Sequence, residues 1–142
     1  MMTPFPTDEK LVARTLAGDR NAFRALVERH YTAVFRLCRS ILHHPEDAED
    51  ATQEVFVRAY QALSQFQGRG AFGAWLRRLT VNHCLNRTQN SSIRAALGLR
   101  LLDGLSYEEI ADIMGVPVNS VRSWLHRGRA RLREALQEVV EC

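Results

Sequence analysis

The stretch LSYEEIADIMGVPVNSVRSWL, residues 105–125, decides how the C-terminal third of this chain folds. Ser106 and Glu109 give it the S-x-x-E pattern of a capping box, directly ahead of an apolar run with helical spacing. Gly115 stands between two such runs, where a tight turn needs a left-handed backbone that glycine adopts at little cost. The pattern predicts a helix-turn-helix, whose second helix enters the major groove of DNA.

The second of these helices carries five arginines and no acid between residues 122 and 133. Because Val121 and Leu125 are expected to face inward, early positions can reach base edges and later ones can reach phosphates. The candidates for DNA contacts are Asn119, Ser120, Arg122, Ser123, His126 and Arg127 near the helix start, and Arg129 and Arg131 for phosphates further along. The first two can also cap the helix. A hairpin with a merely charged surface is the alternative. Trp124 can complete the core or lie against the sugar-phosphate edge of DNA, and we favour the core.

Apolar residues recur with helical spacing along nearly the whole chain, and no strand is expected, so the predicted fold class is all-α. The expected helices run from Asp8, which can cap the first, to before Gly18, and over about 21–42, 46–63, 71–87, 93–102, 106–114 and 119–138. The polar stretch NRTQNSS, residues 86–92, is typical of a linker. We therefore expect two small helical domains, a helical bundle over 8–87 and a helix-turn-helix domain over 93–139, joined by a flexible linker over 88–92.

Composition narrows the class of protein. Hydrophobic residues make up 46% and charged residues 25% of the 142 residues, which is typical of a globular protein rather than a disordered one. No apolar run is long enough to span a membrane and no signal peptide is apparent, so we expect a cytoplasmic protein. We expect Cys38 and Cys84 to be plain buried thiols. Without a nucleophile-base set, a phosphate loop or a metal cluster, we expect no enzyme, no cofactor, no metal and no small-molecule substrate.

Charge is distributed unevenly in the first domain. Five acids fall within residues 46–54, whereas residues 55–102 contain none but hold seven arginines. In the second of these segments aromatic rings alternate with arginines and amides, and the side chains concerned are Phe66, Arg69, Phe72, Trp75, Arg77, Arg78, Asn82 and Asn86. Rings can stack on unpaired bases, arginines follow phosphates and amides read base edges, so the segment suits opened DNA strands. The alternative places the rings in the core, which we favour for Phe72 and Trp75, while Phe66 could be in either place.

Three motifs occur in order: DAEDATQEVFVRAYQAL, FQGRGAFGAWLRRLTVN and GLSYEEIADIMGVPVNSVRSWLHRGRARLREAL. Together they resemble an extracytoplasmic-function (ECF) sigma factor of bacterial RNA polymerase, over about residues 11–136. The resemblance implies a promoter-specificity subunit whose partners are the RNA polymerase core, promoter DNA and an anti-sigma factor that is often membrane-anchored. A stand-alone dimeric helix-turn-helix regulator is the alternative.

The resemblance also assigns roles to residues. Asp50, Gln53, Glu54 and Arg58 would dock on the clamp helices of the largest polymerase subunit, and the second domain would meet the flap region. The 66–71 loop with Asn82 and Asn86 would capture flipped bases of the −10 element, with Arg77 and Arg78 beside them. Arg122, Ser123, His126 and Arg127 would read the −35 element.

The chain departs from the family pattern in two places. Members usually carry a longer linker, and a Leu-Pro pair opens the second domain, whereas TQNSSIRAALGLRLL has neither. About five residues cannot span from a −10 to a −35 element, because extended chain reaches only about 3.5 Å per residue. Either the sequence omits a disordered segment, which we favour because both flanking domains look intact, or the protein is a shortened one. Trp124 is the second departure, since arginine is common at that place.

Overall fold

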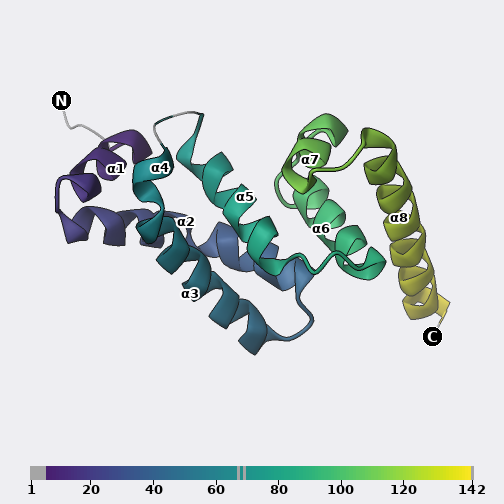
Figure 1. Cartoon of the computed structure of the whole chain (residues 1–142). Coiled ribbons are helices and arrows are strands. Elements are labelled where there is room, and N and C mark those ends of the chain that lie inside the picture. Colours follow the sequence, from purple (N-terminus) through teal and green to yellow (C-terminus); the bar gives the residue numbers. More distant parts are fainter. Residues whose placement is uncertain (1–5, 67, 69, 142) are drawn as a thin grey trace, which may run out of the picture.

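The computed structural model describes residues 6–66, 68 and 70–141, and in these residues all regular secondary structure is helical, which confirms the all-α fold class. The helices, labelled in Figure 1, are α1 (Asp8–Leu16), α2 (Arg20–Ile41), α3 (Pro45–Gln61), α4 (Leu63–Phe66), α5 (Phe72–Cys84), α6 (Gln89–Leu101), α7 (Tyr107–Met114) and α8 (Val118–Glu141). None of these helices combines the length and the apolar character that crossing a bilayer requires.

Helices α1 to α5 form an N-terminal unit built around α2, which packs against α1, α3 and α5. Leu26, Val55 and Phe72 are fully buried between these helices. The cap of α1 differs from the prediction, because Thr7 rather than Asp8 accepts a hydrogen bond from the Lys10 amide. The Asp8 carboxylate is used elsewhere and binds the side chains of Arg29 and His30 on α2 at 2.8 and 3.0 Å, so it ties α1 to α2.

Helices α6 to α8 form a C-terminal unit that contains the expected helix-turn-helix. Both halves of the capping box are present: the Glu109 amide donates to the Ser106 hydroxyl and the Ser106 amide donates to the Glu109 carboxylate. Gly115 ends α7 in the left-handed conformation at φ 68°. The caps expected for the next helix are wrong, because α8 begins at Val118 and Asn119 and Ser120 lie within its first turn.

The flexible linker expected over 88–92 is also wrong. Thr88 caps α6, whose first turn begins at Gln89, and its hydroxyl accepts from the Ser91 amide at 3.1 Å. The polar side chains that suggested a linker therefore cap a helix, and Ser91 is buried in its first turn. Only residues 85–88 connect α5 to α6, and Arg87 takes a left-handed conformation at φ 66° to turn the chain between them.

The two units share one continuous core, because α6 packs along the end of α2. The Arg94 side chain donates at 2.7 Å to the Ile41 carbonyl in the last turn of α2, one of the groups that helix geometry leaves without a partner. Gly98 of α6 lies against Leu37 and Ser40 of α2, where an added Cβ would meet the Ser40 hydroxyl before any carbon atom. The units are distinct in sequence pattern but are held together by these contacts.

Candidate nucleic-acid and polymerase interfaces

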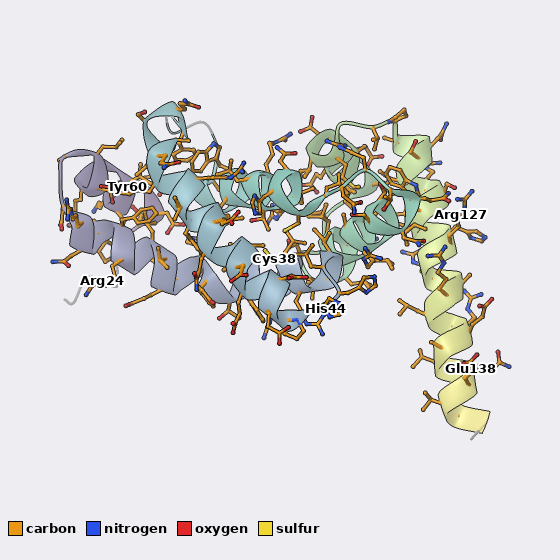
Figure 2. All side chains as sticks on the ribbon, turned by 60° about the horizontal axis from the view of Figure 1, so that its bottom comes forward. Arg24, Cys38, His44, Tyr60, Arg127 and Glu138 are labelled. Carbon is orange, nitrogen blue, oxygen red and sulfur yellow. The ribbon has the colours of Figure 1, made fainter. Side chains whose placement is uncertain are left out.

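The side of α8 expected to face DNA is exposed along its first half. Arg122, Ser123, His126 and Arg127 are all exposed, as is Asn119, and Ser120 is half-buried. Figure 2 shows Arg127 pointing away from the other helices, while the end of α8 that bears Glu138 stands clear of them. Four neighbouring side chains are thus free to enter a groove from one rigid helix.

The opposite side of α8 fixes its position on the protein. Val121 and Leu125 are fully buried against the rest of the C-terminal unit. Gly128 is buried against Leu97 of α6, so the two helices cross at a position without a side chain. Trp124 is half-buried and packs against the core, in agreement with the reading that we favoured.

The two arginines expected to bind phosphates hold contacts within their own unit. Arg129 donates to the Tyr107 hydroxyl at 3.4 Å, and Arg131 donates to the Asn90 side chain at 2.9 Å. Both arginines are nevertheless exposed, so a phosphate could replace these neutral partners.

The −10 candidates are only partly brought together, and Phe66 is not on the surface. Its ring is buried, 5.7 Å from Phe72 and 5.4 Å from Trp75 between centroids. The short helix α4 holds it there, which sequence periodicity did not predict because the segment spans a single turn. A stacking role for Phe66 is therefore not compatible with this fold. Phe72 and the half-buried Trp75 pack in the core as we favoured, and Arg69 lies outside the described residues.

The remaining −10 candidates lie where α5 meets the C-terminal unit. Arg77 forms an ion pair with Asp103 at 3.1 Å, and Arg78 forms one with Asp112 of α7 at 2.7 Å. Asn82 is exposed on α5. Exposed Asn86, in the connection, accepts from the Thr88 amide and hydroxyl. The C-terminal unit thus occupies arginines that were expected to follow DNA.

The four candidates for polymerase contacts are all exposed on α3. Asp50, Gln53, Glu54 and Arg58 recur at helical spacing, and the Glu54 carboxylate also lies 3.0 Å from Nε2 of the half-buried His83 of α5. His83 was not anticipated as part of this face, because only the tertiary structure brings it beside α3.

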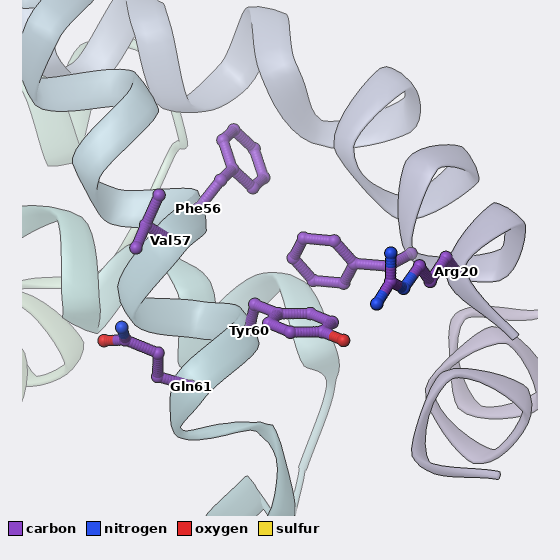
Figure 3. A pocket seen from close by; sticks show the side chains of 6 residues that line it. Arg20, Phe56, Val57, Tyr60 and Gln61 are labelled. Carbon is purple, nitrogen blue, oxygen red and sulfur yellow. The ribbon is translucent and has the colours of Figure 1, made fainter. Parts of the chain in front are cut away.

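A second feature that the sequence did not reveal is an apolar groove next to this face. It has a volume of about 470 Å³, and Figure 3 shows the side chains that line it, which are Arg20, Phe23, Phe56, Val57, Tyr60 and Gln61. The rings of Phe23 and Tyr60 meet edge to face with centroids 5.0 Å apart, so the groove joins the start of α2 to the end of α3. The side chains of Val57 and Tyr60 are 56% and 48% exposed, so the groove presents apolar surface to solvent.

Metal-binding side chains do not gather in the described part of the chain. No group of three or more His, Cys, Asp or Glu side chains there could hold a metal ion. The Glu109 pKa is lowered first by the hydrogen bond from the Ser106 amide, which belongs to the capping box, and then by the Ser106 side chain.

Comparison with known proteins covers both units. The family model for Sigma-70 region 2 matches residues 26–92, and that for Sigma-70 region 4 matches residues 94–132. The ECF RNA polymerase sigma-E factor of Escherichia coli K12 is 32% identical, with 94% of this chain and 96% of the relative covered. The RNA polymerase sigma-H factor of Pseudomonas aeruginosa is 29% identical, with 94% and 95% covered. Among solved structures, CnrH in complex with the cytosolic domain of CnrY superimposes with a TM-score of 0.71 at 30% identity, covering 92% of this chain and 97% of that one.

Proposed function

This chain belongs to the ECF sigma factors, which direct the RNA polymerase core to specific promoters, and we propose that its surfaces divide this task as follows. The exposed face of α3 holds the polymerase, the face of α5 meets the opened −10 element, and the start of α8 reads the −35 element. The observation that carries the proposal is the clustered exposure of Arg122, Ser123, His126 and Arg127 on a helix whose other side is locked into the fold.

The polymerase contact combines charge with an apolar groove. Asp50, Gln53 and Glu54 supply polar contacts on α3, and the groove beside Val57 and Tyr60 offers an apolar site next to them. Buried apolar anchors surrounded by polar groups are typical of protein interfaces in which a few residues contribute most of the binding energy. We place the clamp helices of the largest polymerase subunit on this face.

The −35 contact follows from the geometry of a major-groove helix. Arginine can bind both acceptors of a guanine edge, and Arg122 occupies the first exposed arginine position on α8. Asn119 and Ser123 lie on nearby exposed positions, while Arg129 and Arg131 are suited to phosphates. The flap region of the polymerase would contact the same C-terminal unit.

The −10 contact needs the C-terminal unit to release α5. The Arg78–Asp112 pair is exposed, with 45% and 76% of the two side chains accessible, and such pairs stabilise by only about 0–1 kcal/mol. DNA phosphates can therefore compete for Arg78, and with it Arg77 and Asn82 would be available to the strand. Phe66 has no place in this surface.

We also propose that an anti-sigma factor holds this protein inactive in the cytoplasm. The support is the structure of CnrH in complex with the cytosolic domain of CnrY, because this chain resembles CnrH over nearly its whole length. A partner that covered the α3 face would compete with the polymerase directly.

Transcription in vitro tests the proposal. With the core polymerase and a promoter library, the protein should select a promoter class, and Glu54→Ala should reduce binding to the core more than Glu138→Ala, an exposed acid far along α8. Arg122→Ala should change which −35 sequences are selected, whereas Arg133→Ala should not. Failure of the protein to give promoter-specific transcripts, combined with tight operator binding without polymerase, would instead indicate a stand-alone regulator.

A further inference from the structure

Two buried cysteines that the promoter-binding function does not use lie in direct contact. Cys38 is in the last turns of α2 and Cys84 is the last residue of α5, 46 positions further along the chain. Their sulfur atoms are 3.6 Å apart, and the Cys84 thiol donates to Cys38 Sγ. Both thiols are free.

One of the two cysteines, Cys84, lines a cavity that opens to the surface. This cavity has a volume of about 230 Å³ and is lined by Leu42, Asp47, Asp50, Ala51, Glu54, His83 and Cys84. It is large enough for a small oxidant, because a water molecule occupies about 30 Å³ of liquid. Three carboxylates surround it, so a neutral oxidant would enter more readily than an anionic disulfide such as oxidised glutathione.

The neighbours of the pair make the two thiols unequal. The hydrogen bond from Cys84 lowers the Cys38 pKa, burial opposes this effect, and a hydrogen bond with the Thr52 hydroxyl lowers it further. The hydrogen bond to Cys38 and burial raise the Cys84 pKa. Cys38 is therefore the sulfur on which a thiolate forms first.

We propose that Cys38 and Cys84 form an oxidation site, at which hydrogen peroxide, a neutral oxidant, converts the pair into a disulfide that joins α2 to α5. Hydrogen peroxide meets Cys84 at the cavity, and as the Cys84 sulfur attacks it the thiol proton passes along the hydrogen bond to the Cys38 thiolate. The O–O bond breaks and Cys84 becomes a sulfenic acid, while the released hydroxide takes that proton from Cys38 and leaves as one water. The Cys38 thiolate then attacks the Cys84 sulfur, the S–O bond breaks, and the hydroxide takes up a proton and leaves as a second water. Two thiols lose two electrons, and one peroxide is reduced to two waters.

The site has a consequence for the polymerase face. A disulfide requires the sulfurs to approach from 3.6 Å to about 2.05 Å, which draws the end of α5 towards α2. His83, next to Cys84, is paired with Glu54 on α3, and the connection to α6 begins directly after Cys84. Oxidation would therefore fix the region where the polymerase face and the connection between the two units meet.

Intact-mass measurement tests the proposal on the full-length Cys142→Ser protein, which removes the third thiol. The folded protein is treated with hydrogen peroxide, quenched with catalase, and alkylated in denaturant with and without prior reduction by dithiothreitol. The expected product has lost two hydrogens, accepts no alkyl group before reduction and accepts two after it, and peptide mapping joins the segments of Cys38 and Cys84. In the further variant Cys38→Ala, peroxide should leave a sulfenic acid on Cys84 that dimedone labels.

Two results would overturn the proposal. One is that both thiols of the folded protein remain free at peroxide doses that oxidise the same protein in urea. The other is that each sulfur is oxidised separately to sulfinic acid without joining its neighbour. The mass measurement on the protein with both cysteines tests the proposal even if the Cys38→Ala variant does not fold. Its outcome does not depend on how the protein binds promoter DNA or polymerase.

Discussion

Replacing Gly128 by alanine should misplace the DNA-reading helix, and the size of the effect can be worked out from its surroundings. A Cβ at this position would lie 2.6 Å from Leu97 Cδ1, 2.8 Å from Cγ and 3.0 Å from Cδ2. Because Cγ is the branch point of the leucine side chain, rotation of its end alone cannot relieve the contact. Overpacking of this kind costs about 1–3 kcal/mol, whereas alanine gains about 1 kcal/mol over glycine inside a helix.

Gly98→Ala is the matched control, because it makes the same chemical change in the middle of another helix. Its Cβ would meet the Ser40 hydroxyl at 2.3 Å, but the Ser40 and Leu37 carbon atoms only at 3.2 and 3.3 Å. The hydroxyl can rotate away at the loss of its hydrogen bond to the Leu37 carbonyl, which is worth about 1 kcal/mol net. The helix propensity gained by alanine and the lost hydrogen bond then nearly cancel, so Gly98→Ala should leave the free energy of unfolding almost unchanged.

Urea denaturation followed by circular dichroism measures both variants. We expect Gly128→Ala to lower the free energy of unfolding by about 1 kcal/mol or more relative to Gly98→Ala. The double variant Gly128→Ala/Leu97→Ala should recover part of this loss, with a favourable coupling energy of about 1 kcal/mol, because the new methyl group fills space that the leucine leaves. Equal stability of the two alanine variants, or independent effects in the double variant, would refute the close contact of α6 with α8.

Three further predictions concern charge. Arg122→Ala should cost about 1–3 kcal/mol of −35 binding and relax the preference at one base pair. Arg131→Ala should instead weaken binding to all −35 sequences evenly and reduce the salt slope by about one. Equal effects of the two variants in holoenzyme titrations over a −35 library would contradict this division. Because the Glu109 pKa is lowered in the fold, its contribution to stability is present above the ordinary value of 4.5 and is lost as the pH falls through the lowered pKa. Glu109→Gln should thus flatten the fall of Tm below pH 4.5, and an unchanged slope would argue against it. Asp112→Asn should free Arg78 and so strengthen the binding of a single-stranded −10 oligonucleotide, as measured by fluorescence anisotropy. Adding Arg78→Ala should abolish this gain. An unchanged affinity of Asp112→Asn would show that the ion pair does not compete with DNA.

Local patterns predicted most of the helices because their causes are local. The capping box at Ser106, the left-handed Gly115 and the apolar spacing of α2 each depend on residues within a few positions of one another. The exposed side of α8 followed from its period, since Val121 and Leu125 had to face inward. The cap of α1 was misplaced by one residue, because Asp8 is held by partners on α2 instead.

The sequence-based predictions were wrong where contacts between residues far apart in the chain determine the local structure. Phe66 is turned inward by Phe72 and Trp75, and nothing in its immediate sequence distinguishes this from an exposed ring. Residues 88–92 form a helix start because α6 packs on α2, where Arg94 finds the Ile41 carbonyl. The same docking explains why the acids that pair with Arg77 and Arg78 were not anticipated.

The short connection between α5 and α6 remains the feature that most constrains how this sigma factor works. The alignment with the Pseudomonas relative extends over 184 columns but takes up 94% of 142 residues, about 133, so about 50 columns have no counterpart here. The matches to the two sigma regions end at residue 92 and begin at residue 94, which leaves no room between them.

The surface of α8 agrees with a missing segment in this place. Leu132, Leu136 and Val139 continue the side of α8 that packs on α6, yet they are 44%, 65% and 73% exposed. Asn90, at the start of α6, accepts a hydrogen bond from Arg131, and these three side chains lie further along α8 than this contact. A segment inserted before α6 would enter beside them. It would also lengthen the connection between α5 and α6, whose four residues reach only about 14 Å when extended. The −10 and −35 elements are about 25 base pairs apart, which is roughly 85 Å at 3.4 Å per base pair. We therefore propose that the absence of one segment explains both the exposed stripe and the short reach.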